Sequence, residues 1–303
     1  MIVVAGEALV DLVVGSDGSV ISALGGAPFN TARTCGRLGA EVSFAGAVSN
    51  DRFGTLLAAE LEASGVALDP VQRVDAPTTL AAAEIDDVGV AAYRFYVAGT
   101  SAPALVNPAM PATVDVLVTG GLGLVLEPMA TTIEQIVSAA DEETLVFLDV
   151  NCRPLVIDDR ERYVGGVDRV AERSDVVKVS DEDLDYLHPG LDVRSAAERL
   201  LRLGPSVVLV TRGAQGVNVV SHGDMREVPV ASVDVLDTIG AGDAFGGGFL
   251  AWWVLSGRSR TDLDDLDVVE RAVAAANAVA GVVCTRRGAD PPWRDELPDD
   301  WSS

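Results

Sequence analysis

Cysteine and lysine are scarce in this chain of 303 residues. Cys35, Cys152 and Cys284 are an odd number, lie far apart and contain no CxxC pair, which argues against a disulfide framework and a zinc site. Lys178 is the single lysine, and 22 bases stand against 46 acids for a formal net charge of −24. Such a surface repels phosphate backbones and anionic lipid, so we expect neither nucleic acid nor membranes as partners.

Long apolar runs are also missing. The longest candidate, residues 241–257, is interrupted by Asp243 and by glycines and is better explained as a buried helix than as a membrane span. The first residues lack the basic segment of a signal peptide and reach Glu7 at once. We therefore expect a cytoplasmic protein that begins with a buried strand.

Alternating apolar segments predict the fold class. We expect strands at 2–5, 42–48, 116–119, 145–149, 176–179, 207–211 and 217–221, with helices at 30–38, 53–64, 132–140, 163–172, 181–187, 193–203, 241–255 and 266–283. Strands separated by helices indicate an α/β protein with a mainly parallel central sheet flanked by helices on both faces.

Two segments depart from this rhythm. Residues 9–21 and 79–96 alternate around the turn signals at 16–18 and 86–89, as antiparallel hairpins do. We expect them to form a small β-sheet lid inserted into one domain that spans residues 1–303. Such a lid can cover a ligand at the carboxyl ends of the parallel strands.

The most informative segment is Asp237-Thr238-Ile239-Gly240-Ala241-Gly242-Asp243, which leads directly into a long apolar helix. Two glycines leave the first amides of that helix bare, and the helix dipole adds partial positive charge there. These features predict an anion hole for a phosphoryl group, with Asp243 taking a proton from an attacking hydroxyl. The alternative is a tight glycine turn followed by an ordinary first-turn acid.

This segment resembles the DTxGAGD signature of the ribokinase-like (PfkB) family of sugar kinases. A Gly-Gly pair shortly before Asn30, at 25–26, resembles the family's N-terminal signature. Further segments that resemble motifs of the family occur in the same order as in the family, at residues 6–11, 149–154, 178–183 and 211–216. The resemblance therefore spans nearly the whole chain.

The resemblance implies an ATP-dependent carbohydrate kinase with Asp243 as the catalytic base and the amides of Gly240, Ala241 and Gly242 as the anion hole. It also implies a sugar site at Asp11, Gly25, Gly26 and Asn30. Arg153 is a possible cation for a carboxylate or phosphate, and Phe95 can stack on the apolar face of a sugar. Asn30 as a helix cap, Asp11 as a solvated strand residue and Phe95 as a core residue are the structural alternatives.

The nucleotide side implied by the resemblance comprises Thr211, Gly213, Gly216 and Asn277, with Lys178 and Ser180 near the phosphates. Many relatives carry Asn-x-x-Glu where this chain has Ser180 and Asp183, so Asp183 is the expected, methylene-shorter contact to Mg²⁺ through water. Many relatives also bind K⁺, which implies a site at Asp237, Ile239 and Gly288.

The sequence restricts the identity of the phosphoryl acceptor less than it restricts the class of reaction. The pattern Asp149-x-Asn151-x-Arg153 resembles the branch of fructokinases and 2-keto-3-deoxygluconate kinases, and it does not decide between them. We expect D-fructose as the acceptor, giving fructose 6-phosphate, with 2-keto-3-deoxygluconate second and ribose or a nucleoside third. A non-catalytic sugar-binding regulator is the alternative from another class, and intact Asp243 and glycines argue against it. Family habit implies a homodimer through the lid, with sugar and ATP as the small-molecule partners.

Overall fold

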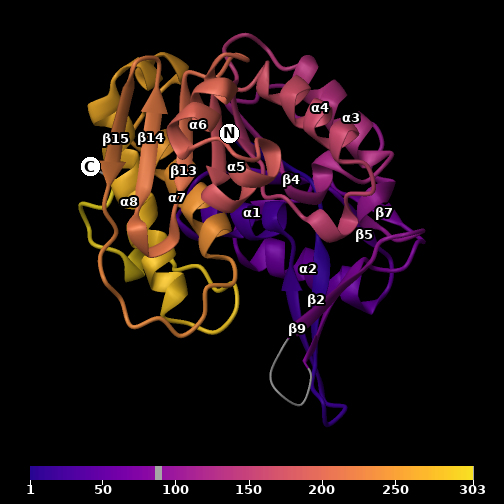
Figure 1. Cartoon of the computed structure of the whole chain (residues 1–303). Coiled ribbons are helices and arrows are strands. Elements are labelled where there is room, and N and C mark those ends of the chain that lie inside the picture. The colour runs from indigo at the N-terminus through magenta and orange to yellow at the C-terminus, as the bar shows by residue number, and fades with distance from the viewer. Residues whose placement is uncertain (86–90, 303) are drawn as a thin grey trace.

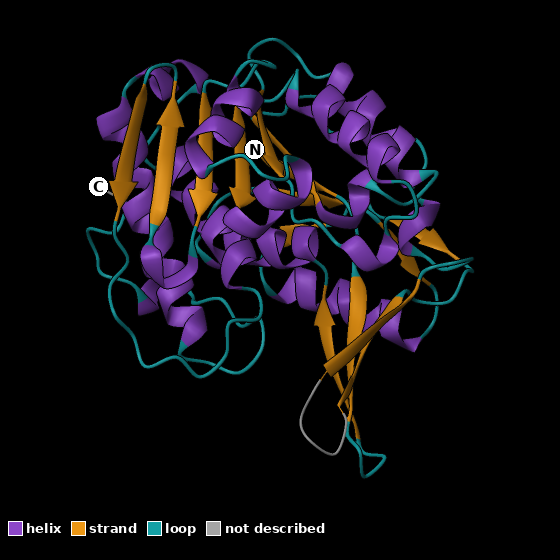
Figure 2. Cartoon of the chain, viewed as in Figure 1, coloured by secondary structure: helices purple, strands orange, loops and turns teal. Residues whose placement is uncertain are grey.

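Short runs rich in valine and leucine form the main sheet, because side chains on both faces of these strands are buried. The computed structural model describes residues 1–85 and 91–302. In this part of the chain the main sheet has nine strands, shown in Figures 1 and 2. Their order is β15 (Asp224–Val228), β14 (Val217–Ser221), β13 (Val207–Thr211), β12 (Val176–Ser180), β11 (Leu145–Asp149), β10 (Val116–Gly120), β1 (Ile2–Ala5), β4 (Val42–Ala45) and β6 (Val66–Ala67).

The neighbouring strands from β13 to β6 pair in parallel, and β14 and β15 add an antiparallel edge. The predicted α/β fold class is therefore confirmed. The strand β15 was not predicted, because Asp224-Met225-Arg226-Glu227 carries little apolar signal.

Helices cover both faces of this sheet. One core cluster joins the sheet to α1 (Ala27–Arg37), α2 (Arg52–Ala63), α7 (Ala241–Leu255) and α8 (Leu266–Cys284). The other joins it to α3 (Met129–Ser138), α4 (Arg160–Ala171), α5 (Asp181–Leu187) and α6 (Val193–Leu201). Short 3-10 turns occupy 102–104, 121–124, 154–156, 213–215, 260–264 and 294–296. No helix among the described residues is both long and apolar enough to cross a bilayer.

Several of the numerous acids have a local structural role. Asp51, Asp159, Asp192 and Asp265 are N-cap residues whose side chains accept hydrogen bonds from backbone amides in the first turns of α2, α4, α6 and α8. Each cap satisfies an amide that the helix cannot pair internally. Part of the negative charge therefore stabilises helix ends.

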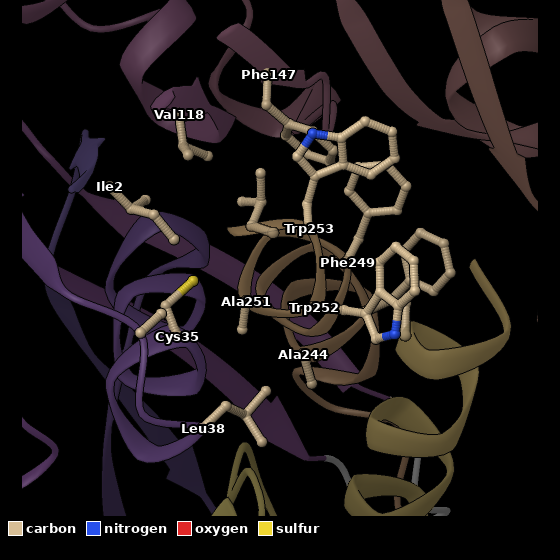
Figure 3. Packing of buried hydrophobic residues seen from close by; sticks show 14 of the residues in the cluster. Ile2, Cys35, Leu38, Val118, Phe147, Ala244, Phe249, Ala251, Trp252 and Trp253 are labelled. Carbon is tan, nitrogen blue, oxygen red and sulfur yellow. The ribbon is translucent and has the colours of Figure 1, made fainter. Parts of the chain in front are cut away.

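The glycine-rich helix α7 lies between α1 and α8. A Cβ at Gly247 would come within 2.5 Å of the Thr34 Cβ, and one at Gly248 would lie 3.1 Å from the Val279 Cβ. The bare face of α7 thus permits close helix packing. Further along, Trp253 stacks on Phe249 with ring centroids 5.4 Å apart, as Figure 3 shows from close by. Trp252 and Trp253 are buried core residues.

The two predicted hairpins form one small sheet that projects from the main body in Figures 1 and 2. Its strand order is β3 (Val20–Gly25), β2 (Leu9–Val14), β8 (Leu80–Ile85) and β9 (Ala91–Tyr96). Strands β2 and β3 pair antiparallel, as do β8 and β9, while β2 and β8 pair in parallel. The first hairpin continues to Gly25, beyond the predicted end at residue 21. The predicted turn at 86–89 lies outside the described residues.

One predicted strand is wrong in extent. The segment 42–48 divides at Gly46 into β4 and β5 (Ala47–Ser49), and β5 pairs with β7 (Gln72–Val74) instead of the main sheet. A Cβ at Gly46 would lie 2.4 Å from the Phe44 ring and 2.7 Å from the Gly6 carbonyl oxygen. A side chain does not fit at this position because the Phe44 ring and the backbone of Gly6 lie so close.

Candidate active site

The carboxyl ends of the central strands bring polar residues to one edge of the main sheet. Glu7 follows β1, while Asp149, Ser180 and Thr211 are the last residues of β11, β12 and β13. Ligands of open α/β sheets bind at this edge. The N-terminus of α7 reaches the same edge, because the Gly242 backbone lies beside the Lys178 side chain of β12.

The predicted anion hole is the N-terminal turn of α7. Gly240 is the N-cap, in the left-handed region at φ 76°, which favours glycine. The Ala241 amide donates to the Thr238 carbonyl over 3.2 Å, so this amide is already shared with a turn. The amides of the first helical turn lack acceptors within the helix. The helix mouth therefore offers main-chain donors to an anion.

Asp243 in this first turn is held by α1. The Asn30 Nδ2 donates to Asp243 Oδ2 over 2.9 Å, and Thr31 Oγ1 donates to the Asp243 carbonyl over 3.4 Å. Desolvation raises the pKa of Asp243 to about 6, and the hydrogen bond from Asn30 opposes this rise. The Asn30 side chain is buried, and its Oδ1 has no hydrogen-bond partner among the described residues. Asn30 is therefore not the helix cap considered as an alternative, because α1 begins at Ala27 with Gly26 as its N-cap.

Asp11 and Phe95 lie on the same face of the small sheet. Asp11 is the register partner of Ala81, which is in turn the partner of Phe95, and directly paired residues share a face. Burial raises the pKa of Asp11 to about 6, opposed by the charge of Arg153. A Cβ at Gly25 would lie 2.2 Å from Asp11 Oδ2, so a side chain there would require the Asp11 carboxylate to move.

Glu7 is a buried acid that the sequence analysis did not assign to the site. Its Oε1 accepts the Ala27 amide over 3.2 Å, and its Oε2 has no partner among the described residues. Burial raises the pKa of Glu7 to about 8. A Cβ at Gly26 would lie 2.8 Å from the Glu7 carbonyl oxygen, which brings the glycine pair against this residue. Glu7 follows the predicted strand 2–5 after a single glycine, Gly6. This position just beyond the carboxyl end of a strand is the feature of the sequence that could have placed Glu7 in the site.

Arg153 is exposed and follows Asn151, which has a positive φ of 43°. Its guanidinium donates to the Cys152 carbonyl over 2.8 Å. The positive charge of Arg153 lowers the pKa of Asp11 and Asp243 against the larger effect of burial. Arg153 therefore lies close enough to Asp11, a predicted sugar residue, and to Asp243, the predicted base, for its charge to act on both.

Lys178 and Asp149 form a buried ion pair beside α7. The Lys178 Nζ lies 2.8 Å from Asp149 Oδ1 and 2.7 Å from Oδ2. Lys178 also lines a cavity of about 340 Å³ together with Gly242, Arg153, Ser180, Asp183 and Thr211. Six residues predicted for the phosphate, sugar, nucleotide and Mg²⁺ sites thus surround one cavity.

Ser180 and Asp183 close the N-terminus of α5. Ser180 Oγ accepts the Asp183 amide over 3.0 Å, and Asp183 accepts amides from Cys152 over 2.9 Å and Ser180 over 3.3 Å. Both Asp183 oxygens therefore already hold backbone donors, which fits a contact to a hydrated ion better than direct coordination. No cluster of three or more His, Cys, Asp or Glu side chains within residues 1–85 and 91–302 has the arrangement of a metal cage.

The remaining nucleotide residues lie farther along the chain. Gly213 and Gly216 bound the 3-10 turn after β13 and both have positive φ, of 52° and 89°. Asn277 lies on α8, where its Nδ2 donates to the Pro229 carbonyl over 3.3 Å. The structure brings Asn277 next to the segment after β15, and it does not join the residues that line the cavity.

The predicted K⁺ residues converge on one carboxylate. Asp237 Oδ1 accepts the Ile239 amide over 3.0 Å, and Oδ2 accepts the Gly288 amide over 2.8 Å. A Cβ at Gly240 would lie 2.4 Å from the Ala289 Cβ, so the two loops are in contact beside the mouth of α7. Asp237 thus ties the loop before α7 to the loop after α8.

Comparison with known proteins finds similarity over nearly the whole chain. The sequence profile described as pfkB family carbohydrate kinase matches residues 1–296. A fructokinase of Rhizobium leguminosarum bv. trifolii is 33% identical over 299 residues, covering 96% of this chain and 87% of the relative.

Two solved structures extend the comparison. A fructokinase from Xylella fastidiosa with bound ATP superposes with a TM-score of 0.87 at 26% identity, covering 98% of this chain and 94% of the other. A fructokinase from Vibrio cholerae O395 with fructose, ADP and calcium ion bound has a TM-score of 0.84 at 25% identity, covering 95% and 94%.

Proposed function

This chain belongs to the pfkB family of carbohydrate kinases, and we propose that it transfers the γ-phosphoryl group of ATP to D-fructose, giving fructose 6-phosphate. The observation that carries the proposal is the Asp243 carboxylate, which stands in the first turn of α7 and accepts a hydrogen bond from Asn30. The fructokinase names of the similar proteins support fructose as the acceptor.

In the proposed reaction Asp243 removes the proton from the primary hydroxyl as that oxygen attacks the phosphorus. A pKa of about 6, raised by burial, leaves Asp243 ionised at neutral pH while keeping it basic enough to accept a proton. The main-chain amides of Gly240, Ala241 and Gly242 stabilise negative charge on the migrating group, with Ala241 shared with Thr238.

The sugar lies between the helix mouth and the lid in this proposal. Asn30 Oδ1, which lacks a partner among the described residues, can accept a hydrogen bond from a hydroxyl. Asp11 can accept from two neighbouring hydroxyls, and Phe95 on the same lid face can cover the apolar side of the ring. The list of proposed sugar residues is Asp11, Gly25, Gly26, Asn30, Phe95 and Arg153.

In this proposal ATP occupies the cavity of about 340 Å³ that Gly242 and Lys178 line. The residues proposed to contact the nucleotide are Lys178, Ser180, Thr211, Gly213, Gly216 and Asn277. Mg²⁺ would arrive with the phosphates and neutralise their developing charge. Asp183 fits a water-mediated contact to this ion because its oxygens already accept two amides.

K⁺ would be held beside the anion hole by Asp237 and by carbonyls of its two loops, including that of Ile239 and those near Gly288. An ion there would fix the loop that leads into α7. We expect activity to increase with K⁺ for this reason.

The proposal is tested by measuring ADP release over a panel of acceptors with Mg²⁺ and ATP, with and without K⁺. The panel contains D-fructose, 2-keto-3-deoxygluconate, ribose and a nucleoside, and the product of the best acceptor is identified by ³¹P NMR. We expect the highest kcat/KM on fructose and phosphorylation at its 6-hydroxyl. A higher kcat/KM on the sugar acid would contradict the choice of fructose.

A second copy of the chain is the proposed macromolecular partner. Val13, Val20, Ile21 and Tyr93 of the small sheet each expose at least 40% of their surface. Apolar exposure of this kind on one appendage favours a homodimer through the lid. Multi-angle light scattering on the purified chain should give twice 31.5 kDa, and substitution of Ile21 by Asp should give the monomer mass. Because the proposed reaction consumes ATP, we expect it to occur in the cytoplasm.

A further inference from the structure

One turn of α1 contacts the surroundings of the proposed base at three points. Asn30 and Thr31 donate to the carboxylate and the carbonyl of Asp243, over 2.9 Å and 3.4 Å. Arg33 reaches in another direction, because its Nη1 donates to the Ala289 carbonyl over 2.9 Å. Ala289 lies in the loop that follows α8. The same helical turn therefore holds both the proposed base and this loop.

Ala289 packs against the start of α7. A Cβ at Gly240, the N-cap of α7, would lie 2.4 Å from the Ala289 Cβ and 2.9 Å from its Cα. The adjacent Gly288 amide donates over 2.8 Å to Asp237 Oδ2, in the segment that leads into α7. The loop is therefore fixed from two sides, by Asp237 at Gly288 and by Arg33 at Ala289.

Arg33 is a buried cation, with only 6% of its surface exposed. Its Nη2 pairs with Glu60 of α2, and its Cζ lies 5.5 Å from the centroid of the Phe29 ring. Burial lowers the pKa of Arg33, opposed by the charge of Glu60, and its Nε has no hydrogen-bond partner in residues 1–85 and 91–302. Apolar residues of similar volume often stabilise a protein as well as a buried ion pair does. The stability of the fold alone therefore does not explain a guanidinium at this position.

We propose that Arg33 is a positioning residue that holds Ala289 against Gly240 and thereby fixes the N-terminal turn of α7 for phosphoryl transfer. This inference rests on the proposed kinase function. Arg33 contacts neither substrate in this proposal and acts through the main chain of the loop. Donors stabilise charge in a transition state when they are already in place, and a displacement of about 1 Å can cost about 10²-fold in rate. Holding Gly240 in place therefore contributes to the rate of transfer and not to sugar binding.

Arg33→Met should separate turnover from sugar binding. We expect kcat to fall by about 10- to 10²-fold, because the amides at the mouth of α7 lose their fixed position. The KM for fructose should stay within about threefold, since Asn30 and Asp11 are unaltered. Arg33→Lys keeps a cation that can pair with Glu60 and donate to the Ala289 carbonyl, so it should recover part of the lost kcat.

The chain offers a matched control in Arg173. Its guanidinium pairs with Asp175 and donates to the carbonyls of Asp141 and Thr144 over 2.6 Å and 3.3 Å. These residues precede β11 and β12, at the end of the sheet opposite the site. Arg173→Met also removes a cation from an acid and a loop, so it should lower stability without changing kcat. A kcat for Arg33→Met within about twofold of that for Arg173→Met would overturn the proposal.

Ala289→Gly tests the same contact without removing a buried charge. The substitution deletes the methyl group that lies against Gly240 and leaves the pair of Arg33 and Glu60 intact. We expect kcat to fall by about threefold or more with an unchanged KM for fructose, because Gly240 loses its neighbour. An unaltered kcat in this variant would overturn the proposal, even where Arg33→Met does not fold.

Hydrogen exchange of the loop amides tests the positioning role without turnover. The Gly288 and Ile239 amides both donate to Asp237, and they exchange when this arrangement opens. In Arg33→Met both amides should exchange about 10-fold faster or more, whereas Arg173→Met should retain the rates of the parent. Unchanged exchange in Arg33→Met, followed by ¹⁵N NMR, would contradict the positioning role.

The exchange measurement distinguishes this inference from the proposed function. Faster exchange in Arg33→Met, in a protein that phosphorylates none of the sugars, would contradict the fructose assignment and support the contact of Arg33 with the loop. Turnover on fructose, with unaltered exchange and unaltered kcat in Arg33→Met, would have the opposite meaning.

Discussion

Asn30 Nδ2 donates a hydrogen bond to Asp243 Oδ2 across 2.9 Å, although 213 residues separate them in the chain. The bond joins the helix that follows the lid to the helix that carries the proposed base. Since Gly25 ends β3 and Gly26 caps α1, the lid leads into Asn30 almost directly. The positions of the proposed sugar-binding segment and the proposed base are therefore coupled through this contact.

The pH dependence of turnover should report Asp243. Burial raises its pKa to about 6, and a carboxylic acid that is protonated cannot accept the hydroxyl proton. We expect kcat to increase with pH through an acid limb centred near pH 6 and to level off above pH 7. Steady-state rates at saturating fructose and ATP between pH 4.5 and 8.5 would measure this limb, and a flat profile would contradict the assignment.

Replacing Asn30 by Ala should move this acid limb to higher pH. The hydrogen bond from Asn30 lowers the pKa of Asp243, so its loss makes the protonated form more favourable. Thr31→Ala is a matched control on the same helix, because Thr31 Oγ1 donates to the Asp243 carbonyl and not to its carboxylate. The limb should stay in place in that control, and an unmoved limb in Asn30→Ala would show that the contact does not tune the base.

Replacing Glu7 by Gln should change how stability depends on pH. Burial raises the pKa of Glu7 from 4.5 to about 8, so the folded parent binds a proton that the unfolded chain releases between these values. The parent should therefore lose stability as pH rises from about 4.5 to 8, and the Gln variant should lack this contribution. Urea unfolding at pH 5 and pH 8 would measure the difference.

The free energy of unfolding of Glu7→Gln should increase relative to that of the parent as pH increases from 5 to 8. Equal pH dependence in both proteins would mean that Glu7 is ionised in the folded state. Because Glu7 Oε1 accepts the Ala27 amide, Glu7→Ala should in addition raise the KM for fructose by loosening the Gly25-Gly26 segment.

Arg153→Ala should harm turnover on 2-keto-3-deoxygluconate more than on fructose. A guanidinium can form two parallel hydrogen bonds with the carboxylate of the sugar acid, which fructose lacks. The ratio of kcat/KM values on the two acceptors measures the effect, with Arg169→Ala as a surface arginine control on α4. Equal losses on both acceptors would remove Arg153 as a specificity residue.

The sequence predicted the elements whose signal is local. The bounds of β1, β11, β13, α5 and α7 agree with the predicted segments, because valine-rich runs and the glycine boundary at Gly240 leave little choice. The placement of Asp243 at a helix mouth followed from the same boundary. The order of the family's motifs along the chain then indicated which distant residues, such as Asn30, would lie near Asp243.

The remaining features depend on tertiary contacts that no local pattern contains. Glycine is needed at position 46, where β4 has ended, because the Gly6 carbonyl approaches from the end of β1. Asp11 and Phe95 share a face only because β2 pairs in parallel with β8, two strands from hairpins far apart in the chain. The burial of Glu7 and the ion pair of Lys178 with Asp149 likewise require the packed edge of the sheet.

Comparison of the parent with Asp243→Asn tests the central claim most directly. The variant keeps the size of the side chain and removes its capacity to accept the proton, so kcat on fructose should fall by about 10²–10⁴-fold while the Kd for ATP stays within a few fold. Single-turnover formation of fructose 6-phosphate and calorimetric ATP binding give the two quantities. Near-normal phosphorylation by Asp243→Asn would contradict the assignment of Asp243 as the base.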